Sequence, residues 1–263
     1  MRVSAWPWAL SLVAAAPSAA AVPQRVASLN LCTDEILLLL ADSRQIASVT
    51  HLSQKSEESR LWRAARRYRS NDGSLLSVVS VKPDLVLTMG GGARDRGVIA
   101  KGLGLRIVDL PYPQRLADVQ SSITVVAGAL GRSAEGKALN GRINALRRSA
   151  PRRRWDTLWL GGGGRTVPDT GLAAEWMRLA GMRQRPIAGD RVSLEQLLVR
   201  PPQLLLRSDY RQGQYSSEQR WLSHPLARHV RAGRTIATDG RAWTCMGPTL
   251  IPEIERLRRE VGR

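Results

Sequence analysis

Two stretches of the chain share one order of apolar and polar positions. The first, residues 74–89 (SLLSVVSVKPDLVLTM), predicts a short amphipathic helix, a break at Lys82-Pro83 and a buried strand over residues 85–87. Pro83 lacks a backbone N–H and pushes the residue before it out of the helical region, so the helix has to end there. The apolar run that follows is too short for a helix and precedes Gly90-Gly91-Gly92, which is typical of a strand in a parallel sheet.

The same order recurs at residues 193–208, SLEQLLVRPPQLLLRS. Ser74 corresponds to Ser193, Pro83 to Pro202, and the strand at 85–87 to Leu204-Leu205-Leu206. Helix–turn–strand units with a proline at the turn also recur by chance in α/β proteins. We interpret the repeat as two lobes of similar build, which would face each other across a cleft that binds a ligand.

Short apolar stretches alternate with amphipathic ones along the rest of the chain. Strands are predicted at 25–29, 46–50, 105–110, 155–160 and 235–238; helices at 33–41, 93–103, 116–130, 133–148, 171–180, 217–221 and 248–261. Thr33 is the expected cap of the first helix, and residues 51–73 are expected to be irregular. Such alternation predicts mostly parallel sheets. We therefore predict an α/β fold of two Rossmann-like lobes with mostly parallel sheets, joined by one long interdomain helix.

The expected domain order is a signal peptide at 1–21, an N-terminal lobe at 22–132, the interdomain helix at 133–150 and a C-terminal lobe at 151–263. Arg2, the apolar stretch 8–16 and the small residues 19–21 are typical of an export signal, although a structural helix would have the same pattern. The apolar stretch is too short to span a bilayer. Because no cysteine sits at the expected cleavage point, no lipid anchor is expected, and the mature chain would be soluble and outside the inner membrane.

Basic residues outnumber acidic ones, 40 to 22, for a formal net charge of +18. Such a surface favours nucleic acid, anionic lipid headgroups or an anionic small ligand. Nucleic-acid motifs are absent from the sequence, so no nucleic-acid partner is expected. The densest arginines, Arg147-Arg148 and Arg152-Arg153-Arg154, flank the predicted lobe junction and are interpreted as a solvated face.

Four segments together resemble the periplasmic substrate-binding proteins of ATP-driven importers for vitamin B12 and ferric siderophores. They are RVASLNLCTDEILLLLA, VKPDLVLTMGG, LGLRIVDL and SLEQLLVRPPQLLL, and the likeness runs from about Arg25 to Glu260. The resemblance implies two lobes joined by a rigid helix, a cleft for a metal chelate, small opening motions and no catalysis. It also implies a monomer that docks onto an ABC-type permease in the inner membrane.

Members of this family commonly dock through one glutamate on each lobe. Glu195 matches the second-lobe glutamate, whereas the corresponding first-lobe residue here is Leu76, which cannot form an ion pair. Docking could use Glu57 or Glu58 instead, could be one-sided, or could involve a different permease. An ordinary exposed helix residue is the alternative for Glu195.

Candidate ligand residues lie at the predicted carboxyl ends of strands, where ligands bind in parallel α/β sheets. Tyr and Trp side chains would supply walls for a flat ring, glycine N–H groups would face a close ligand, and arginines would pair with anionic edges. The alternatives are core packing for the aromatics and ordinary surface for the arginines. The ligand set is Cys32, Gly91, Gly92, Arg94, Tyr112, Gly163, Arg165, Tyr210, Arg211 and Trp243.

The two cysteines, Cys32 and Cys245, have three possible states: buried thiols, a disulfide across the lobes, or contacts to a ligand metal. The three histidines lack metal-site spacing, so no metal site and no resident cofactor are expected.

We predict a periplasmic solute-binding protein that carries cobalamin or a ferric siderophore. The alternatives are an exported enzyme that uses a nucleotide or cofactor, and a surface or regulatory protein on the same fold. The loops GGGARD and GGGGRT match neither common nucleotide-binding pattern, which argues against the enzyme.

Overall fold

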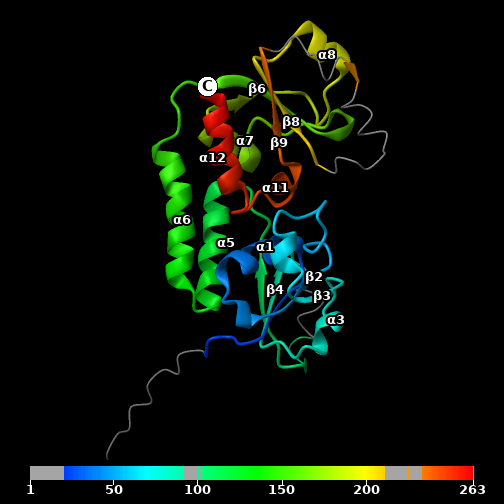
Figure 1. The fold of residues 1–263 in the computed structure, drawn as a ribbon, viewed down its shortest axis with the longest axis vertical. Coiled ribbons are helices and arrows are strands. Elements are labelled where there is room, and N and C mark those ends of the chain that lie inside the picture. Colours follow the sequence, from blue (N-terminus) through cyan, green and yellow to red (C-terminus); the bar gives the residue numbers. More distant parts are fainter. Residues whose placement is uncertain (1–20, 92–99, 101, 211–223, 226–232, 263) are drawn as a thin grey trace, which may run out of the picture.

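Two lobes are stacked along the long axis of the molecule (Figure 1). The structure is a computed structural model and describes residues 21–91, 100, 102–210, 224–225 and 233–262. The predicted export signal lies almost wholly outside the described residues, as do most of the helix predicted at 93–103 and all of the helix predicted at 217–221. Among the described residues, no helix is both long enough and apolar enough to cross a membrane.

The N-terminal lobe is built on a five-stranded parallel sheet of order β3-β2-β1-β4-β5. Its strands are β1 Val26–Ser28, β2 Ile46–Thr50, β3 Arg69–Asn71, β4 Leu85–Met89 and β5 Arg106–Leu110. Its helices are α1 Leu31–Leu40, η1 Ser43–Gln45, α2 Trp62–Ala65, α3 Leu76–Val79 and α5 Leu116–Ala129. Strand β4 is buried at every position, as its apolar run predicts for a central strand covered on both faces.

The C-terminal lobe holds a four-stranded parallel sheet of order β7-β6-β8-β9. Its strands are β6 Trp155–Leu160, β7 Met182–Gln184, β8 Leu204–Ser208 and β9 Arg234–Thr238. Its helices are η2 Gly162–Gly164, α7 Gly171–Leu179, α8 Leu194–Val199, α11 Gly240–Cys245 and α12 Leu250–Val261. The predicted α/β class with two parallel-sheet lobes is therefore confirmed.

The two copies of the repeat occupy equivalent places. Strand β4 lies between β1 and β5, and β8 lies between β6 and β9. In both lobes, the residue after the repeated proline accepts backbone hydrogen bonds at the start of the neighbouring strand. Asp84 accepts hydrogen bonds from the backbone N–H groups of Gln24 (2.6 Å) and Arg25 (3.0 Å), and Gln203 Oε1 accepts one from Asp156 N (3.1 Å). The sequence repeat thus marks a structural repeat.

Helix α6, Ser133–Arg148, has the predicted bounds and follows α5 along one flank of the molecule (Figure 1). It carries the chain from the N-terminal lobe to β6, and it also contacts α12 of the C-terminal lobe. Arg142 on α6 donates to Glu255 on α12 at 2.9 Å. One cluster of buried apolar side chains runs through both lobes and includes Leu116, Ile143 and Trp176. The lobes are therefore packed together along this flank.

Three local predictions were wrong. Helix α1 begins at Leu31 with Asn30 as its cap, because the Asn30 side chain accepts from Cys32 N at 2.8 Å; Thr33 is buried and its hydroxyl faces Ser28 Oγ at 2.7 Å. Residues 243–245, which lie between the predicted strand 235–238 and the predicted helix 248–261 and were expected to form a loop, belong to α11, since Asp239 caps that helix through Arg241 N. The segment 51–73, expected to be irregular, contains α2 and β3.

Candidate ligand site between the lobes

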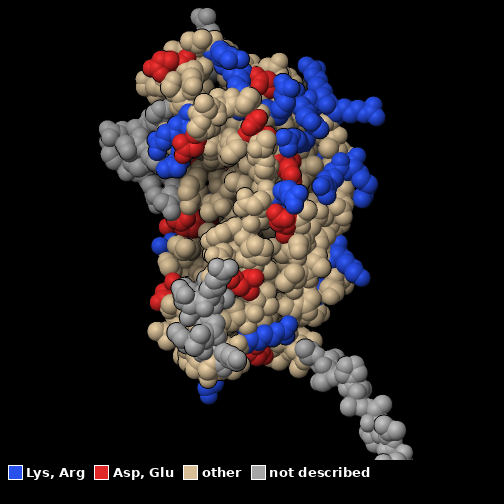
Figure 2. Space-filling model, turned by 180° about the vertical axis from the view of Figure 1, so that it is seen from behind, with Lys and Arg blue, Asp and Glu red and all other residues tan. Residues whose placement is uncertain are grey.

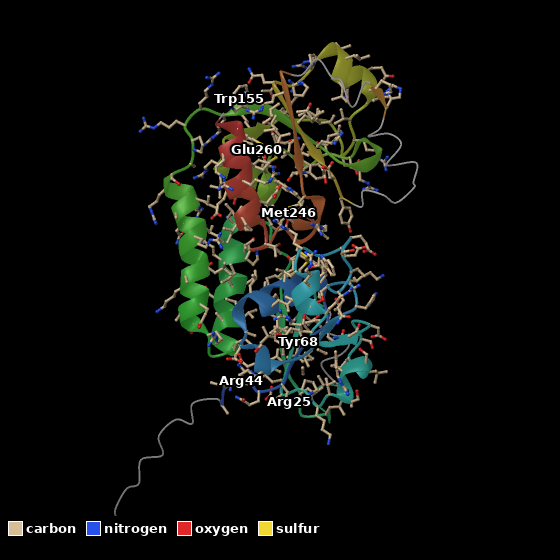
Figure 3. All side chains as sticks on the ribbon, in the orientation of Figure 1. Arg25, Arg44, Tyr68, Trp155, Met246 and Glu260 are labelled. Carbon is tan, nitrogen blue, oxygen red and sulfur yellow. A yellow bond between two sulfur atoms is a disulfide. The ribbon has the colours of Figure 1, made fainter. Side chains whose placement is uncertain are left out.

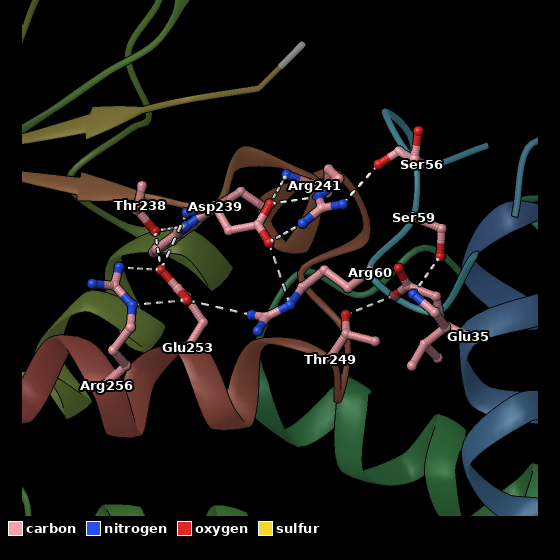
Figure 4. A network of polar contacts seen from close by, with 12 residues as sticks. Glu35, Ser56, Ser59, Arg60, Thr238, Asp239, Arg241, Thr249, Glu253 and Arg256 are labelled. Carbon is pink, nitrogen blue, oxygen red and sulfur yellow. Dashed lines mark hydrogen bonds and ion pairs between the residues drawn. The ribbon is translucent and has the colours of Figure 1, made fainter. Parts of the chain in front are cut away.

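The carboxyl ends of the strands in both lobes point toward the region where the lobes meet (Figure 1). Met246, which follows α11 in a left-handed conformation, lies between the lobes (Figure 3). Its carbonyl accepts a hydrogen bond from Trp176 Nε1 at 2.9 Å. The segment 51–60, which follows β2, reaches from the N-terminal lobe to the C-terminal lobe and makes several of the polar contacts between them (Figure 4).

Arg60 is the central cation of these contacts. Its Nε lies 3.4 Å from Asp239 Oδ2, and its Nη1 lies 3.3 Å from Glu253 Oε2. Burial alone would raise the pKa of Glu253, but hydrogen bonds from Arg256 and Thr238 outweigh it and hold that pKa below its ordinary value. Glu253 is therefore a buried anion at neutral pH, and it presents a negative charge to the opposite lobe.

Two further contacts cross the same edge of the cleft. Arg241 pairs with Asp239 at 2.8 Å and also donates to the carbonyl of Ser56 at 2.7 Å. The hydroxyl of Tyr210 donates to Glu58 Oε2 at 2.5 Å. Arg60 and Arg241 thus connect the end of β9, α11 and α12 to the segment 51–60 (Figure 4), and Tyr210 adds a contact from the residues that follow β8.

A disulfide joins Cys32 in the first turn of α1 to Cys245 at the end of α11, with the two Cα atoms 5.3 Å apart. Of the three possible states of these cysteines, the structure shows the cross-lobe disulfide. The sulfur of Cys32 is consequently not a thiolate that could bind a ligand metal. Contact between a ligand and other atoms of Cys32 stays a prediction.

Two buried carboxyl groups follow Cys32 on α1, Asp34 in the first turn and Glu35 directly after it. Burial raises the pKa of Asp34 to about 7, although hydrogen bonds from Ser28 and Thr50 oppose the rise. Burial also raises the pKa of Glu35 to about 8, against the hydrogen bond that Thr249 of the C-terminal lobe donates to Glu35 Oε2 at 2.8 Å. At neutral pH, Glu35 is therefore mostly a neutral acid at the contact between the lobes.

A cavity of about 560 Å³ opens beside this network. Charged and hydroxyl side chains dominate its lining, which comprises Ser56, Glu57, Asp209, Ala237, Thr238, Asp239, Arg241, Glu253 and Arg256. None of these residues was predicted from the sequence as a ligand contact, although Glu57 was named as an alternative docking residue. The position of Asp239 directly after a predicted strand was the one available signal, whereas Ser56 and Glu57 belong to a segment without periodicity.

Tyr112 is the most exposed of the predicted aromatic walls, with 57% of its surface accessible. It follows β5, and its ring lies over Gly90 at the end of β4 so closely that a Cβ at Gly90 would overlap it. Gly90 and Gly91 both have positive φ angles, 86° and 80°, which glycine adopts without strain. A flat aromatic surface beside bare backbone is thus available at this end of the N-terminal sheet.

The other predicted ligand residues fall into three groups. Gly163 and Arg165 lie in and beside the η2 turn that follows β6, where the Arg165 side chain is 55% exposed and Nη1 lies 4.0 Å from Asp190. Trp243 is only 3% exposed; it stacks obliquely on Trp159 at 6.1 Å and donates to Thr238 Oγ1 at 2.8 Å, so the structure places it in the core rather than on an open wall. Gly92, Arg94 and Arg211 lie outside the described residues.

The predicted docking residue Glu195 is exposed in the first turn of α8. A hydrogen bond from Ser193 holds the pKa of Glu195 below its ordinary value, so it carries a full negative charge at neutral pH. Leu76, its counterpart on α3, is 76% exposed. Helices α3 and α8 lie on the same side of the molecule, opposite α6 (Figure 1).

Two stacked parallel-sheet lobes with facing strand ends and a helical flank define the class of two-lobed solute-binding proteins. Residues 26–236 match the family described as periplasmic binding protein, and the chain belongs to that family. This match confirms the resemblance noted from the sequence. A search of curated proteins finds no match.

Solved structures extend the comparison at low sequence identity. The vitamin B12 binding protein BtuF of Vibrio cholerae is 17% identical with a TM-score of 0.64, covering 92% of this chain and 97% of its own. A periplasmic heme binding protein from Pseudomonas aeruginosa is 18% identical with a TM-score of 0.65, covering 90% and 92%. The siderophore binding protein BauB, bound to ferric iron and two acinetobactin molecules, is 14% identical with a TM-score of 0.69, covering 91% and 94%. These likenesses establish the shared fold.

Proposed function

We propose that this chain captures a metal chelate between its lobes and delivers it to an ATP-driven importer in the inner membrane. The main support for this proposal is that the strand ends of two parallel sheets meet between the lobes of a periplasmic binding protein. Ligands bind at such ends in parallel α/β sheets. The related structures bind vitamin B12, haem and a ferric siderophore, which supports cobalamin, haem or a ferric siderophore as the ligand class.

Within this proposal, each exposed cleft residue has a physical role. Tyr112 stacks against the flat face of a macrocycle or aromatic chelator. Arg165 pairs with an anionic edge, and the backbone of Gly91, around which a Cβ would meet nothing within 4 Å, admits a close ligand. Tyr210 would have to exchange its hydrogen bond with Glu58 for one with the ligand. Gly92, Arg94, Gly163 and Arg211 stay proposed contacts.

The proposed route of delivery begins with export through a cleaved signal at residues 1–21 and continues with docking of the soluble monomer on a permease. Glu195 would meet an arginine of the permease. On α3, the exposed Leu76 and Val79 would replace the missing carboxylate with an apolar contact. Docking would then be electrostatic on one lobe and apolar on the other.

The test is a titration of the chain from Val22 onward with cyanocobalamin, hemin and a panel of ferric siderophores, followed by calorimetry. Saturable binding at micromolar concentration or tighter would support the proposal and name the ligand. Tyr112→Ala should weaken that binding about tenfold, since stacking contacts of this kind contribute about 1 kcal/mol or more. Val125→Ala, at an exposed apolar position on α5 with 46% of its surface accessible, serves as the control. Absence of binding to every compound would overturn the chelate class.

A further inference from the structure

Five exposed arginines crowd one end of the C-terminal lobe. Arg147 and Arg148 close α6, and Arg152, Arg153 and Arg154 form the loop that enters β6. Because the carboxyl ends of the C-terminal strands face the other lobe, the amino end of β6 points away from it. Trp155, the first residue of β6, indeed lies toward the outer end of the C-terminal lobe (Figure 3). We call these five residues the arginine cap.

The backbone that carries the arginine cap is held in place. The Pro151 ring packs on Gly181, where an added Cβ would lie 3.2 Å from Pro151 Cγ. Trp155 N donates to the carbonyl of Gly181 at 2.9 Å, and the Arg153 guanidinium lies 5.2 Å from the centre of the Trp155 ring. Arg258 on α12 donates to the Leu146 carbonyl at 2.7 Å. The cap is therefore a cationic surface on a fixed backbone, with an indole at its edge.

The negative ends of nearby helix dipoles balance only part of the positive charge of the arginine cap. Helices α6, α7 and α12 all end at this side of the lobe, and each helix end carries about half a negative charge, or about 1.5 charges together. Against them stand the five cap arginines together with Arg178, Arg258 and Arg259 in the last turns of α7 and α12. The positive charge is several times larger than the helix ends require.

Nearby carboxylates do not neutralise the excess. Glu260 pairs with Arg256, Glu255 with Arg142, and Asp156 with Arg185. Within the part of the chain that the structure describes, no carboxylate forms an ion pair with a cap arginine; Arg147 donates to the neutral amide of Gln120. Lys and Arg are denser over the C-terminal lobe than over the N-terminal lobe on the face drawn in Figure 2.

We propose that the arginine cap binds the anionic headgroup surface of a phospholipid bilayer. Guanidinium groups bind phosphate in a bidentate manner, and a cluster of four to eight basic residues gains attraction from every charge near an anionic membrane. Trp155 at the edge of the cap is the residue type that prefers the interface between water and lipid. A double-stranded nucleic acid is the competing anion. This proposal goes beyond chelate binding and does not depend on it.

The experiment is co-sedimentation of the chain from Val22 onward, which contains every described helix and strand, with lipid vesicles. One set of vesicles is phosphatidylcholine alone, and the other contains one third phosphatidylglycerol. We expect binding only to the anionic vesicles, and we expect added salt to weaken it because exposed charges are screened.

Two matched variants separate the cap from total charge. The first changes the five cap arginines to Gln. The second changes five exposed arginines of the N-terminal lobe to Gln, with the same loss of net charge: Arg63, Arg66, Arg67, Arg69 and Arg106. The cap variant should lose about tenfold or more of its vesicle affinity, and the control no more than about twofold.

Three results would overturn the proposal: no binding of the parent chain to anionic vesicles, an equal loss in both variants, or displacement from vesicles by a DNA duplex at lower concentration than by free phosphatidylglycerol. If the five-residue cap variant unfolds, the variant limited to residues 152–154, which lie outside any helix, replaces it. That variant should show a smaller loss in the same direction, again with no loss in an Arg63, Arg66 and Arg67→Gln control.

Discussion

Glu35 is a single residue through which pH acts on the contact between the lobes. Its side chain is buried against the C-terminal lobe, and its pKa is raised from 4.5 to about 8. Between these two pH values the folded chain keeps a proton that the unfolded chain releases. The stabilisation from this proton is complete below pH 4.5 and is lost as pH rises toward 8.

Glu35→Gln should therefore flatten the dependence of unfolding free energy on pH. The unfolding free energy of the variant minus that of the parent chain should rise by up to about 1.4 kcal/mol per pH unit between pH 5 and pH 8. The variant therefore gains stability relative to the parent as the pH rises. Urea unfolding followed by tryptophan fluorescence measures it. Glu195→Gln is the control, since the pKa of Glu195 is lowered and lies below that window. Parallel curves for the parent and Glu35→Gln would contradict the burial argument.

Gly240 marks the closest approach of α11 to the end of β8. An added Cβ would overlap Tyr210 Cβ and Ser208 Oγ and would lie 2.6 Å from Tyr210 N. Gly240→Ala should lower the unfolding free energy by about 1 to 3 kcal/mol, because backbone atoms cannot move aside.

Gly141, exposed within α6, is the matched contrast, since an added Cβ there would have nothing within 4 Å. Gly141→Ala should stabilise the chain by about 0.5 to 1 kcal/mol. Equal effects of the two substitutions on the thermal midpoint would refute this reading.

At the scale of residues, the positions of residues at strand ends could be predicted where the signal was local, whereas their role in ligand binding stays a prediction. The exposed Tyr112 and the glycines after β4 followed from their positions at strand ends. The polar network did not, because its partners are distant in sequence: Arg60 and Glu253 are 193 residues apart, and Glu35 and Thr249 are 214 apart. Pairs of this kind leave no periodic pattern. Trp243 was selected for its place after a strand, but α11 turns its ring into the core.

At the scale of elements, the repeat was the most informative sequence feature. Pro83 and Pro202 end one helix and lead into one central strand in each lobe, so a local pattern predicted two distant elements. The strands with weaker patterns, β3 and β7, were missed. Each is only three residues long and lies at a sheet edge, where partial exposure removes the continuous apolar run of a central strand.

The residues that follow the two prolines should contribute unequally to the stability of their lobes. Asp84→Ala removes a charged acceptor of two backbone hydrogen bonds, whereas Gln203→Ala removes a neutral acceptor of one. Because Asp84 is exposed, we expect a cost of about 1 to 2 kcal/mol for the first substitution and about 0.5 to 1 kcal/mol for the second. Chemical denaturation of both variants checks the order, and a larger loss for Gln203→Ala would be the contrary result.

At the scale of the whole molecule, the alternation of strands and helices was enough to predict two parallel-sheet lobes and the bounds of α6. It was not enough to predict how the lobes meet. Their contact depends on the apolar flank formed by α5, α6, α7 and α12 and on the segment 51–60, where Arg60, Glu58 and the carbonyl of Ser56 contact the C-terminal lobe. The pairing of the cysteines likewise depends on that three-dimensional arrangement.

Reduction of the disulfide should lower the stability of the whole chain by about 2 to 4 kcal/mol, because the cross-link restricts the unfolded state. Thermal unfolding with and without a thiol reductant should show a lower midpoint for the reduced parent chain. A Cys32→Ser, Cys245→Ser double variant should match the reduced parent and be insensitive to the reductant. An unchanged midpoint on reduction would mean that packing alone holds the lobes together.

The same bond has a consequence for cleavage of the chain. It spans 213 positions of sequence, from the first turn of α1 to the end of α11, and so encloses nearly all of both lobes. A protease that nicks the backbone once anywhere between the two cysteines leaves two fragments that are still covalently joined. The nicked protein would migrate as one species in electrophoresis without a reductant and as two with it, so a cut in a loop of either lobe need not release any part of the molecule.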